Sequence, residues 1–400
     1  MEYRVNPELA ADLTRFQEAG VNLNKCFNCG TCTAVCAHAE GGQAFPRKII
    51  RYAQLGLDGR LQESPEPWLC YYCGNCSETC PREANPAELM MAARRWLTSR
   101  YDWTGLSRKL YLSTTWEIAL LAGAALAVLA FFLVPGWLGV PFGFSNIGSE
   151  GAAHVRLDLF APKEVIHYAD WVLAAVLGLL LGINALRMIV FVRRGQRGVK
   201  IPVTAWFTQL PQLLIHGATQ RRWLDCRTKV RNRWMLHLML VTGYATMFLL
   251  VVLFLPAFQR DGAEFHYSAV FGYYATVALL AATFIFARDR VKKEAEVAKF
   301  SHVTDWMFLA LLFLTALSGI ALHLARLLDL PYPTYVLYVL HLMIAVPMLV
   351  IEVPFGKWLH LVFRPVSEYL VAVGRAAERK AASRQVKSLA AAARSRVAAL

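Results

Sequence analysis

The chain has 400 residues, of which 56% are hydrophobic and 18% charged, and its mean hydropathy is +0.38. A chain this apolar is typical of membrane proteins rather than of ordinary soluble domains. The formal net charge of +14 is compatible with nucleic-acid binding, but the positions of the basic residues, given below, argue against that class.

Residues 1–110 are polar and mixed, and they are predicted to form a small helical head. Eight of the nine cysteines lie here, between Cys26 and Cys80. No apolar signal segment precedes them, so we expect the head to face a reducing cytoplasm. In that compartment the thiolates are expected to bind metal rather than to form disulfides.

The cysteines form two copies of one motif, C-x2-C-x2-C-x3-C, in "CFNCGTCTAVC" (26–36) and "CYYCGNCSETCP" (70–81). In two-cluster ferredoxins the fourth cysteine of such a run ligates the other cluster. This rule predicts two 4Fe–4S clusters, one on Cys26, Cys29, Cys32 and Cys80 and one on Cys70, Cys73, Cys76 and Cys36. Structural zinc, which prefers paired C-x2-C knuckles, is the alternative. Neither His38 nor Cys226 is expected to be a ligand, and His38 is expected at the surface.

Six apolar stretches after the head are long enough to cross about 30 Å of hydrocarbon. They are predicted at about 116–134, 166–192, 235–255, 267–287, 303–327 and 335–362. These stretches define a transmembrane domain over residues 111–365, followed by a basic cytoplasmic tail at 366–400. The charged segment 193–233, between the second and third stretches, is expected to lie along the membrane surface.

The basic residues are distributed unevenly about these stretches. If the head is cytoplasmic, 36 of the 42 Lys and Arg residues lie on the inner side, and only Arg156, Lys163 and Arg260 lie in outer loops. This asymmetry predicts an inner-membrane protein with its N-terminal head and C-terminal tail in the cytoplasm. The positive charge therefore indicates topology and contact with anionic lipid, and no nucleic acid is expected as a partner.

Seven histidines lie near the ends of the apolar stretches, in two layers. Three are at the head end (His237, His302 and His360) and four at the far end (His167, His266, His323 and His341). Histidine holds haem b in helical bundles, and polar groups at such positions are costly and usually functional. Two haems are therefore predicted. Because His341 and His360 share the sixth stretch, a single helix is expected to carry one ligand of each haem.

Two parts of the sequence resemble known families. "CFNCGTCTAVC" and "WLCYYCGNCSETCPREANPAELM" resemble the small iron–sulfur subunit of heterodisulfide reductase. "RNRWMLHLMLVTGY" and "VLYVLHLMIAVPMLVIEVPFGKWLHLVFRPVSEYL" resemble the cytochrome b subunit of respiratory nitrate reductase. Their fusion in this order resembles the membrane subunits of quinone-interacting membrane-bound oxidoreductase complexes. The expected fold is mainly α, with a two-cluster ferredoxin-like head and a six-span bundle of cytochrome b type.

The resemblance implies which histidines hold the haems. His237 and His360 match one ligand pair, which gives the inner haem. His341 matches a ligand of the outer haem, but no histidine stands near Met247, where the family has its partner. His323 is the predicted replacement, because it should lie at similar depth, and His167 is the runner-up.

The resemblance also implies a function and partners. Electrons would pass between menaquinone and two cytosolic heterodisulfide-reductase-A-like flavoproteins (QmoA and QmoB), and from them to or from adenylylsulfate reductase. Two alternatives are a component of a heterodisulfide-reductase-like or sulfite-pathway complex, and a non-catalytic iron–sulfur anchor. Two residue pairs are candidates for handling quinol protons, His302 with Asp305 and His167 with Asp170, although each pair also fits a capped helix start.

Overall fold

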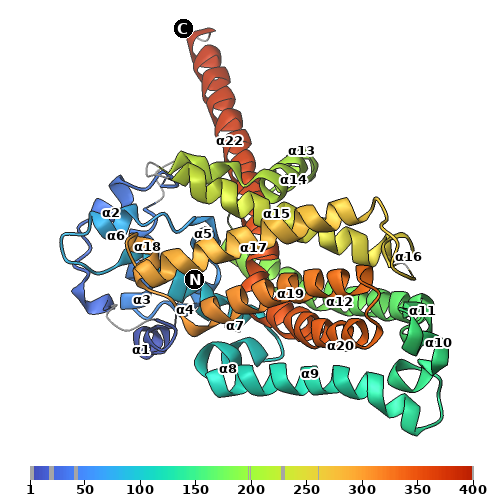
Figure 1. Ribbon diagram of the computed structural model, residues 1–400. Helices are drawn as coiled ribbons and strands as arrows, with labels where there is room; N and C mark the ends of the chain where they lie inside the picture. The colour runs from blue at the N-terminus through green and yellow to red at the C-terminus, as the bar shows by residue number, and fades with distance from the viewer. Residues whose placement is uncertain are drawn as a thin grey trace.

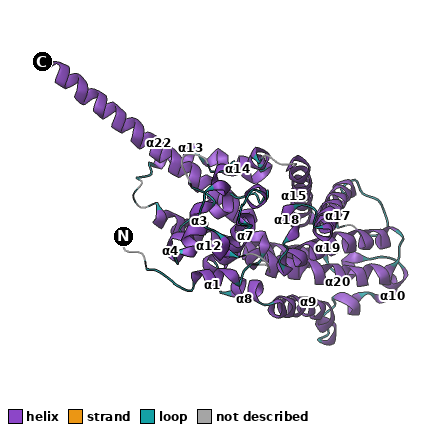
Figure 2. Ribbon diagram, turned by 90° about the vertical axis from the view of Figure 1, so that its left-hand side faces the viewer, coloured by secondary structure: helices purple, strands orange, loops and turns teal. Residues whose placement is uncertain are grey.

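The computed structural model describes residues 4–17, 22–39, 44–196, 198, 200–226, 230–259 and 261–398. All regular elements within these ranges are helical, as predicted, and no strand is present among them (Figure 2). Arg260, one of the three predicted outer basic residues, lies outside the described residues. The helices divide into a compact group of short ones near the N-terminus and a set of long ones (Figure 1).

The head consists of short helices packed around the cysteine loops. Its elements are α1 (Leu9–Thr14), η1 (Leu23–Lys25), α2 (Thr31–Ala34), α3 (Arg47–Gln54), α4 (Asp58–Gln62), α5 (Glu66–Leu69), α6 (Asn75–Glu78), α7 (Pro86–Tyr101) and α8 (Leu106–Leu112). Trp96 and Tyr101 of α7 are buried in its core. Met188, Val192 and Phe363 belong to the same buried cluster, although they come from later helices. The head therefore shares one hydrophobic core with the long helices and is anchored to them.

Among the described residues, six helices have the length and composition of membrane spans, which matches the predicted number. They are α9 (Thr114–Trp137), α12 (Lys163–Gly195), α15 (Val230–Val252), α17 (Ala269–Lys292), α19 (Val303–Leu327) and α20 (Pro331–Pro347), the last extended by further turns to Phe355. Figure 1 shows them side by side, with the head at one end. Short elements connect them at the far end: η2 (Gly143–Asn146), α10 (Gly148–Ala153), α11 (Leu157–Phe160) and α16 (Leu255–Phe258).

The head-end connections are also short helices. The segment between the second and third spans forms α13 (Val203–Thr208), α14 (Leu210–Thr219) and η3 (Arg221–Asp225), while α18 (Glu296–Lys299) joins α17 to α19. Trp223 of η3 is buried against Tyr71 of the head. The segment 193–233 therefore contributes to the junction with the head, a role that its amphipathic character did not predict.

The sixth span does not continue as a single helix through 335–362, and that prediction is wrong. After α20 comes a π-helical turn, η4 (Met348–Glu352), then α21 (Val353–Phe355), an extended Gly356 and η5 (Lys357–Leu359). A new helix, α22, runs from His360 to Ala398 and crosses the bundle (Figure 1). Proline removes a backbone donor, so Pro347 and Pro354 weaken this stretch of helix. His341 and His360 therefore lie on different helices.

The tail also differs from the expectation, because no boundary falls near residue 366. That position lies inside α22, and Leu370 and Val373 of the same helix are buried. The beginning of the predicted tail therefore packs into the protein, and only the later turns of α22 project from it (Figure 1).

Gly356 allows the chain to turn sharply between the sixth span and α22. A Cβ atom at this position would lie 2.8 Å from the carbonyl oxygen of Glu352 and closer still to its carboxylate. We expect Gly356→Ala to destabilise the protein by about 1–3 kcal/mol, as overpacking of a buried site does. Thermal unfolding in detergent measures this change. Gly182→Ala is the control, because its Cβ would meet open space, and equal unfolding temperatures for the two variants would contradict the expectation.

Candidate functional site

The two cysteine motifs fold into loops of the same conformation. Gly30 and Gly74 occupy equivalent positions and have φ angles of 93° and 90°. Asn28 and Tyr72, also equivalent, have positive φ angles of 66° and 53°. Each glycine precedes a one-turn helix, α2 or α6. Left-handed backbone suits glycine and is uncommon for other residues, so its recurrence at two matching positions indicates that the loops are structural repeats.

The thiols of the two loops are interleaved rather than kept apart. Burial and the neighbouring thiolates of Cys70 and Cys73 raise the pKa of Cys36 to about 12, so the fourth cysteine of the first motif lies beside the second motif. Burial and the thiolates of Cys26 and Cys29 raise the pKa of Cys32 to about 11. Such crowding of potential negative charges favours a bound cation.

The spacing of these thiols suits an iron–sulfur cluster. Structural zinc prefers paired C-x2-C knuckles instead. Thiolates at C-x2-C-x2-C spacing are the usual ligands of 4Fe–4S clusters. The cysteine set therefore fits two such clusters, with the ligand assignment still resting on the spacing.

His38 is not a surface residue, contrary to the prediction, since only 4% of it is exposed. Its Nε2 lies 3.6 Å from Sγ of Cys226, which is itself buried and hydrogen-bonded to Cys73. The shared core with Tyr71 and Trp223 explains this burial. Residues 38, 73 and 226 are far apart in the sequence, so no local pattern indicated that they would meet.

The predicted inner pair, His237 and His360, does come together. Their ring centroids are 6.2 Å apart. Two imidazoles on opposite sides of one metal, each about 2 Å from it, have their ring centres about 6 Å apart. Nδ1 of His360 donates a hydrogen bond to the carbonyl oxygen of Lys357 (2.6 Å), which fixes the ring as outer-shell bonds fix metal-binding histidines. These two residues therefore fit a haem iron.

A cavity of about 240 Å³ lies at this pair, between the head and the membrane helices. His237 and His360 line it together with several basic residues, namely Arg94, Arg95, Arg233, Arg290, Lys357 and Arg364. Arginine and lysine pair well with carboxylates, so the lining suits a planar cofactor with acidic substituents. Burial lowers the pKa of Lys357 to about 8, and the Asp305 carboxylate opposes that shift.

An unbroken series of rings connects this pair to the second cysteine loop. The ring centroids of Tyr71 and Trp223 are 5.6 Å apart, and those of Trp223 and His237 are 5.2 Å apart. Arg364, one turn after His360, lies over the Tyr71 ring at 4.2 Å and donates a hydrogen bond to the carbonyl oxygen of Cys70 (3.0 Å). No sequence pattern pointed to Trp223, whereas the position of Arg364, four residues after His360, was a usable signal.

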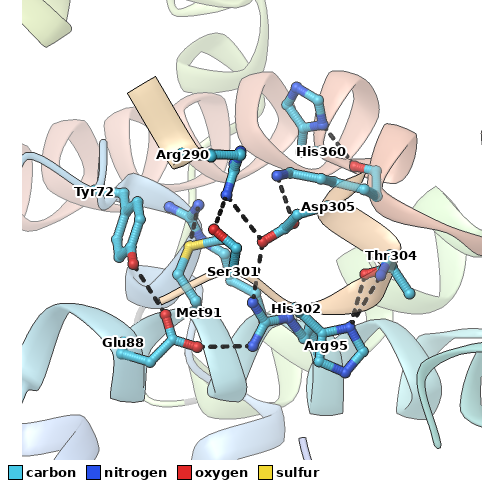
Figure 3. Close-up of polar contacts among 12 residues, drawn as sticks. Tyr72, Glu88, Met91, Arg95, Arg290, Ser301, His302, Thr304, Asp305 and His360 are labelled. Atoms are coloured by element: carbon cyan, nitrogen blue, oxygen red, sulfur yellow. Dashed lines mark hydrogen bonds and ion pairs between the residues drawn. The ribbon is translucent and has the colours of Figure 1, made fainter. Parts of the chain in front are cut away.

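An ion network also joins the second cysteine loop to the membrane helices (Figure 3). Tyr72 donates to Glu88 (3.0 Å), which accepts a second hydrogen bond from Arg95 (2.9 Å). Arg95 also lies 3.5 Å from Asp305, at the start of α19. Lys357 Nζ donates to Asp305 (2.5 Å), and Arg290 lies 3.7 Å from it. Asp305 therefore faces three cations from different helices.

The side chains of His302 and Asp305, proposed from the sequence as a proton-handling pair, form no hydrogen bond with each other, although the backbone N–H of Asp305 donates to the carbonyl oxygen of His302 (2.8 Å). His302 caps α19, because its Nδ1 accepts a hydrogen bond from the backbone N–H of Thr304 (3.3 Å). Burial and the nearby Arg95 lower the pKa of His302 to about 4, so its ring stays neutral as an acceptor near pH 7. In this structure His302 caps a helix and Asp305 belongs to the ion network, while a part for the pair in handling quinol protons stays a prediction. No bond joins His167 to Asp170 either, since His167 accepts from Trp171 (3.1 Å).

The predicted outer ligands face different partners. Nδ1 of His341 is 3.0 Å from the Ser318 hydroxyl, and Nε2 of His323 is 2.8 Å from the Tyr273 hydroxyl. Each ring is therefore within hydrogen-bonding distance of a hydroxyl group in this structure. The outer haem site stays a prediction.

Comparison with known proteins identifies the head. Residues 22–84 match the 4Fe–4S dicluster domain. The chain is 39% identical over 80 residues to a protein of Archaeoglobus profundus that is similar to the C subunit of heterodisulfide reductase, covering 20% of this chain and 43% of that protein. It is 37% identical over 75 residues to the C subunit of H(2):CoB-CoM heterodisulfide,ferredoxin reductase of Methanothermobacter thermautotrophicus, covering 19% and 40%.

A third relative covers slightly more of the chain. The iron-sulfur C subunit of the CoB--CoM heterodisulfide reductase of Methanopyrus kandleri is 32% identical over 99 residues, which are 23% of this chain and 52% of that protein. This chain thus spans about half or less of the relatives it matches, and no solved structure matches it. The head is a two-cluster iron–sulfur electron-transfer unit similar to the C subunit of heterodisulfide reductase, and six apolar helices follow it.

Proposed function

We propose that this chain is the membrane electron-transfer subunit of a quinone-linked oxidoreductase complex. It would pass electrons between menaquinone, its substrate, and cytosolic flavo-iron–sulfur partners through two b haems and two 4Fe–4S clusters. The observation that carries the proposal is the pairing of His237 and His360. Their ring centroids are 6.2 Å apart, and they line a cavity that is also lined by Tyr71 and Tyr72 of the second cysteine loop. Three domains are proposed: 1–110 as the head, 111 onward as the haem domain, which includes the buried first turns of α22, and the projecting later turns of α22 as the tail.

The haems and clusters supply one-electron storage when bound, and the protein sets their positions. His237 and His360 would hold the inner haem, and Cys70, Cys73, Cys76 and Cys36 the nearer cluster. The rings of Trp223 and Tyr71 lie between these sites. The basic side chains of the cavity stabilise negative charge there.

The other cluster, on Cys26, Cys29, Cys32 and Cys80, would exchange electrons with the soluble partner. Cys29 is exposed, and neighbouring Phe27 is 60% exposed. An apolar side chain beside a redox centre at the surface is suited to a docking contact. The partners proposed are two heterodisulfide-reductase-A-like flavoproteins, with adenylylsulfate reductase beyond them, and the basic inner side implies that head and tail are cytoplasmic at the inner membrane.

A second candidate is favoured by the comparisons, since the relatives described above are C subunits of heterodisulfide reductases or similar to them. In that case the terminal acceptor would be a disulfide or a sulfite-pathway enzyme, with the same cofactors in this chain. The proteins that copurify with the chain would separate the two candidates. A non-catalytic iron–sulfur anchor is the third, and it predicts no haem.

The test is a visible absorption spectrum of the purified membrane complex before and after addition of a menaquinol analogue, with haem and iron counted per chain. We expect two reducible b haems and about eight further irons, as two four-iron clusters require. Clusters without haem would favour the anchor, and haem that does not respond to quinol would contradict the proposed substrate.

A further inference from the structure

Two glutamates are buried where α9 begins and where the sixth span ends. Glu117 stands in the first turn of α9, and Glu352 ends the π-helical turn η4. Their exposed fractions are 1% and 0%. Neither lines the cavity at His237 and His360, and neither belongs to the ion network around Asp305. The proposed electron path therefore leaves both of them without a role.

The turn η4 packs against α9, and the two carboxyl groups lie close enough to interact. None of their four oxygens has a hydrogen-bond partner among the described residues. An ionised carboxylate that is buried without a donor or a cation is costly. Two negative charges close together also oppose double ionisation. Burial and proximity therefore both favour a proton on the pair in the folded protein.

The groups around the two carboxyl groups do not balance their negative charge. Tyr111 from α8 lies within electrostatic range of Glu352 and also of Arg95 and Asp305. On the α12 side Asn184, 1% exposed, donates a hydrogen bond to the carbonyl oxygen of Pro354 (3.2 Å). No Lys or Arg among the described residues forms an ion pair with either glutamate. Unpaired carboxyl groups at such depth are costly and usually functional.

The pair is connected to the inner histidine site through a few backbone residues. Gly356 donates a backbone hydrogen bond to the carbonyl oxygen of Glu352 (2.9 Å). The carbonyl oxygen of the next residue, Lys357, accepts the bond from His360 that orients its ring. The π-helical turn that places Glu352 is a feature often found at functional sites. A single short stretch of backbone therefore carries both Glu352 and the carbonyl oxygen that orients His360.

We propose that Glu117 and Glu352 form a proton-uptake site, which shares one proton at rest and binds a second when the inner haem is reduced. The electron comes from quinol. The proton comes from water on the head side of the membrane and forms an O–H bond with the second carboxylate. Oxidation by the nearer cluster releases that proton again. An added electron in a low-dielectric interior favours uptake of a compensating proton. The redox link rests on the proposed haem, whereas the resting proton does not.

The test is infrared difference spectroscopy of the intact complex, reduced minus oxidised, with dithionite as reductant and with 13C-carboxyl-labelled glutamate. We expect a carboxylic-acid carbonyl band that gains intensity on reduction and shifts both with the label and in D2O. This band should be absent in Glu352→Gln and in Glu117→Gln. Glu294→Gln, at a side chain that is 78% exposed, is the matched control and should keep the band.

A pH titration gives a second readout. The midpoint potential of the inner haem should fall as pH rises, approaching about 59 mV per tenfold change in proton concentration, the one-electron value. Glu352→Gln should flatten this slope. A haem that is reduced normally with no labelled carboxyl band overturns the inference and leaves the proposed function standing. A preparation without haem overturns the proposed function and the redox link together, and the unlabelled and labelled resting spectra then decide whether the pair holds its proton.

Discussion

Replacing His360 with alanine is expected to remove the inner haem and to disconnect the membrane domain from the clusters. Half of the b-haem absorbance should be lost, while the iron of the two clusters stays at about eight per chain. The rate at which a menaquinol analogue reduces the clusters should fall by more than about 100-fold. Loss of an outer-shell partner alone costs about 10–100-fold in related metal sites, and this change removes the ligand itself.

His237→Ala should give the same spectrum, because one iron needs both rings, which lie 6.2 Å apart. Residues that act as a unit are not additive, so the double variant should lose no more haem than either single one. His154→Ala is the control, since its side chain is 72% exposed at the far end of the molecule. Full haem content in His360→Ala would contradict the assignment of this ligand.

Features encoded by neighbouring residues could be predicted from the sequence. The cysteine spacing predicts both loops, and the structure gives them the same conformation at Gly30 and Gly74. Apolar length alone predicts six spans, and six are found in the part of the chain that the structure describes. In both cases the signal lies within a short stretch of sequence. His237 and His360, which the family resemblance paired, lie with their ring centroids 6.2 Å apart, and their role as haem ligands stays a prediction.

The break after the sixth span could not be predicted in the same way. Membrane helices often tolerate proline, because neighbouring groups satisfy the freed backbone, so Pro347 and Pro354 did not show where the helix ends. The combination of a π-helical turn with Gly356 ends it. As a result the sequence indicated one helix carrying both His341 and His360, where the structure has two.

Contacts between residues that are far apart in the chain could not be predicted from the sequence either. His38 meets Cys226 across 188 positions, and Glu117 meets Glu352 although each lies in a different predicted span. A single sequence contains no signal for such pairs, because their partners are decided by the packing of whole helices. The junction between the head and the membrane helices depends on long-range contacts of this kind.

Asp305 is the residue at this junction whose loss is expected to be most damaging to stability. It is 5% exposed and faces Lys357, Arg95 and Arg290 at 2.5, 3.5 and 3.7 Å. Asp305→Asn keeps the shape of the side chain but leaves these cations without their shared anion. Removing one partner from a buried ion pair costs about 3–5 kcal/mol. We therefore expect a marked fall in the unfolding temperature in detergent.

The same substitution should also disturb the haem site, because Lys357 holds both Asp305 and the ring of His360. A shifted or partly lost inner-haem signal, with the clusters retained, is the expected spectrum. Asp158→Asn is the control, since this carboxylate is 41% exposed and pairs with Lys163 at the surface of the far end, where an ion pair contributes about 0–1 kcal/mol. If Asp305→Asn were as stable as Asp158→Asn, the head would be held by its shared hydrophobic core alone. Cluster and haem would then keep their spacing without the ion network that Figure 3 shows.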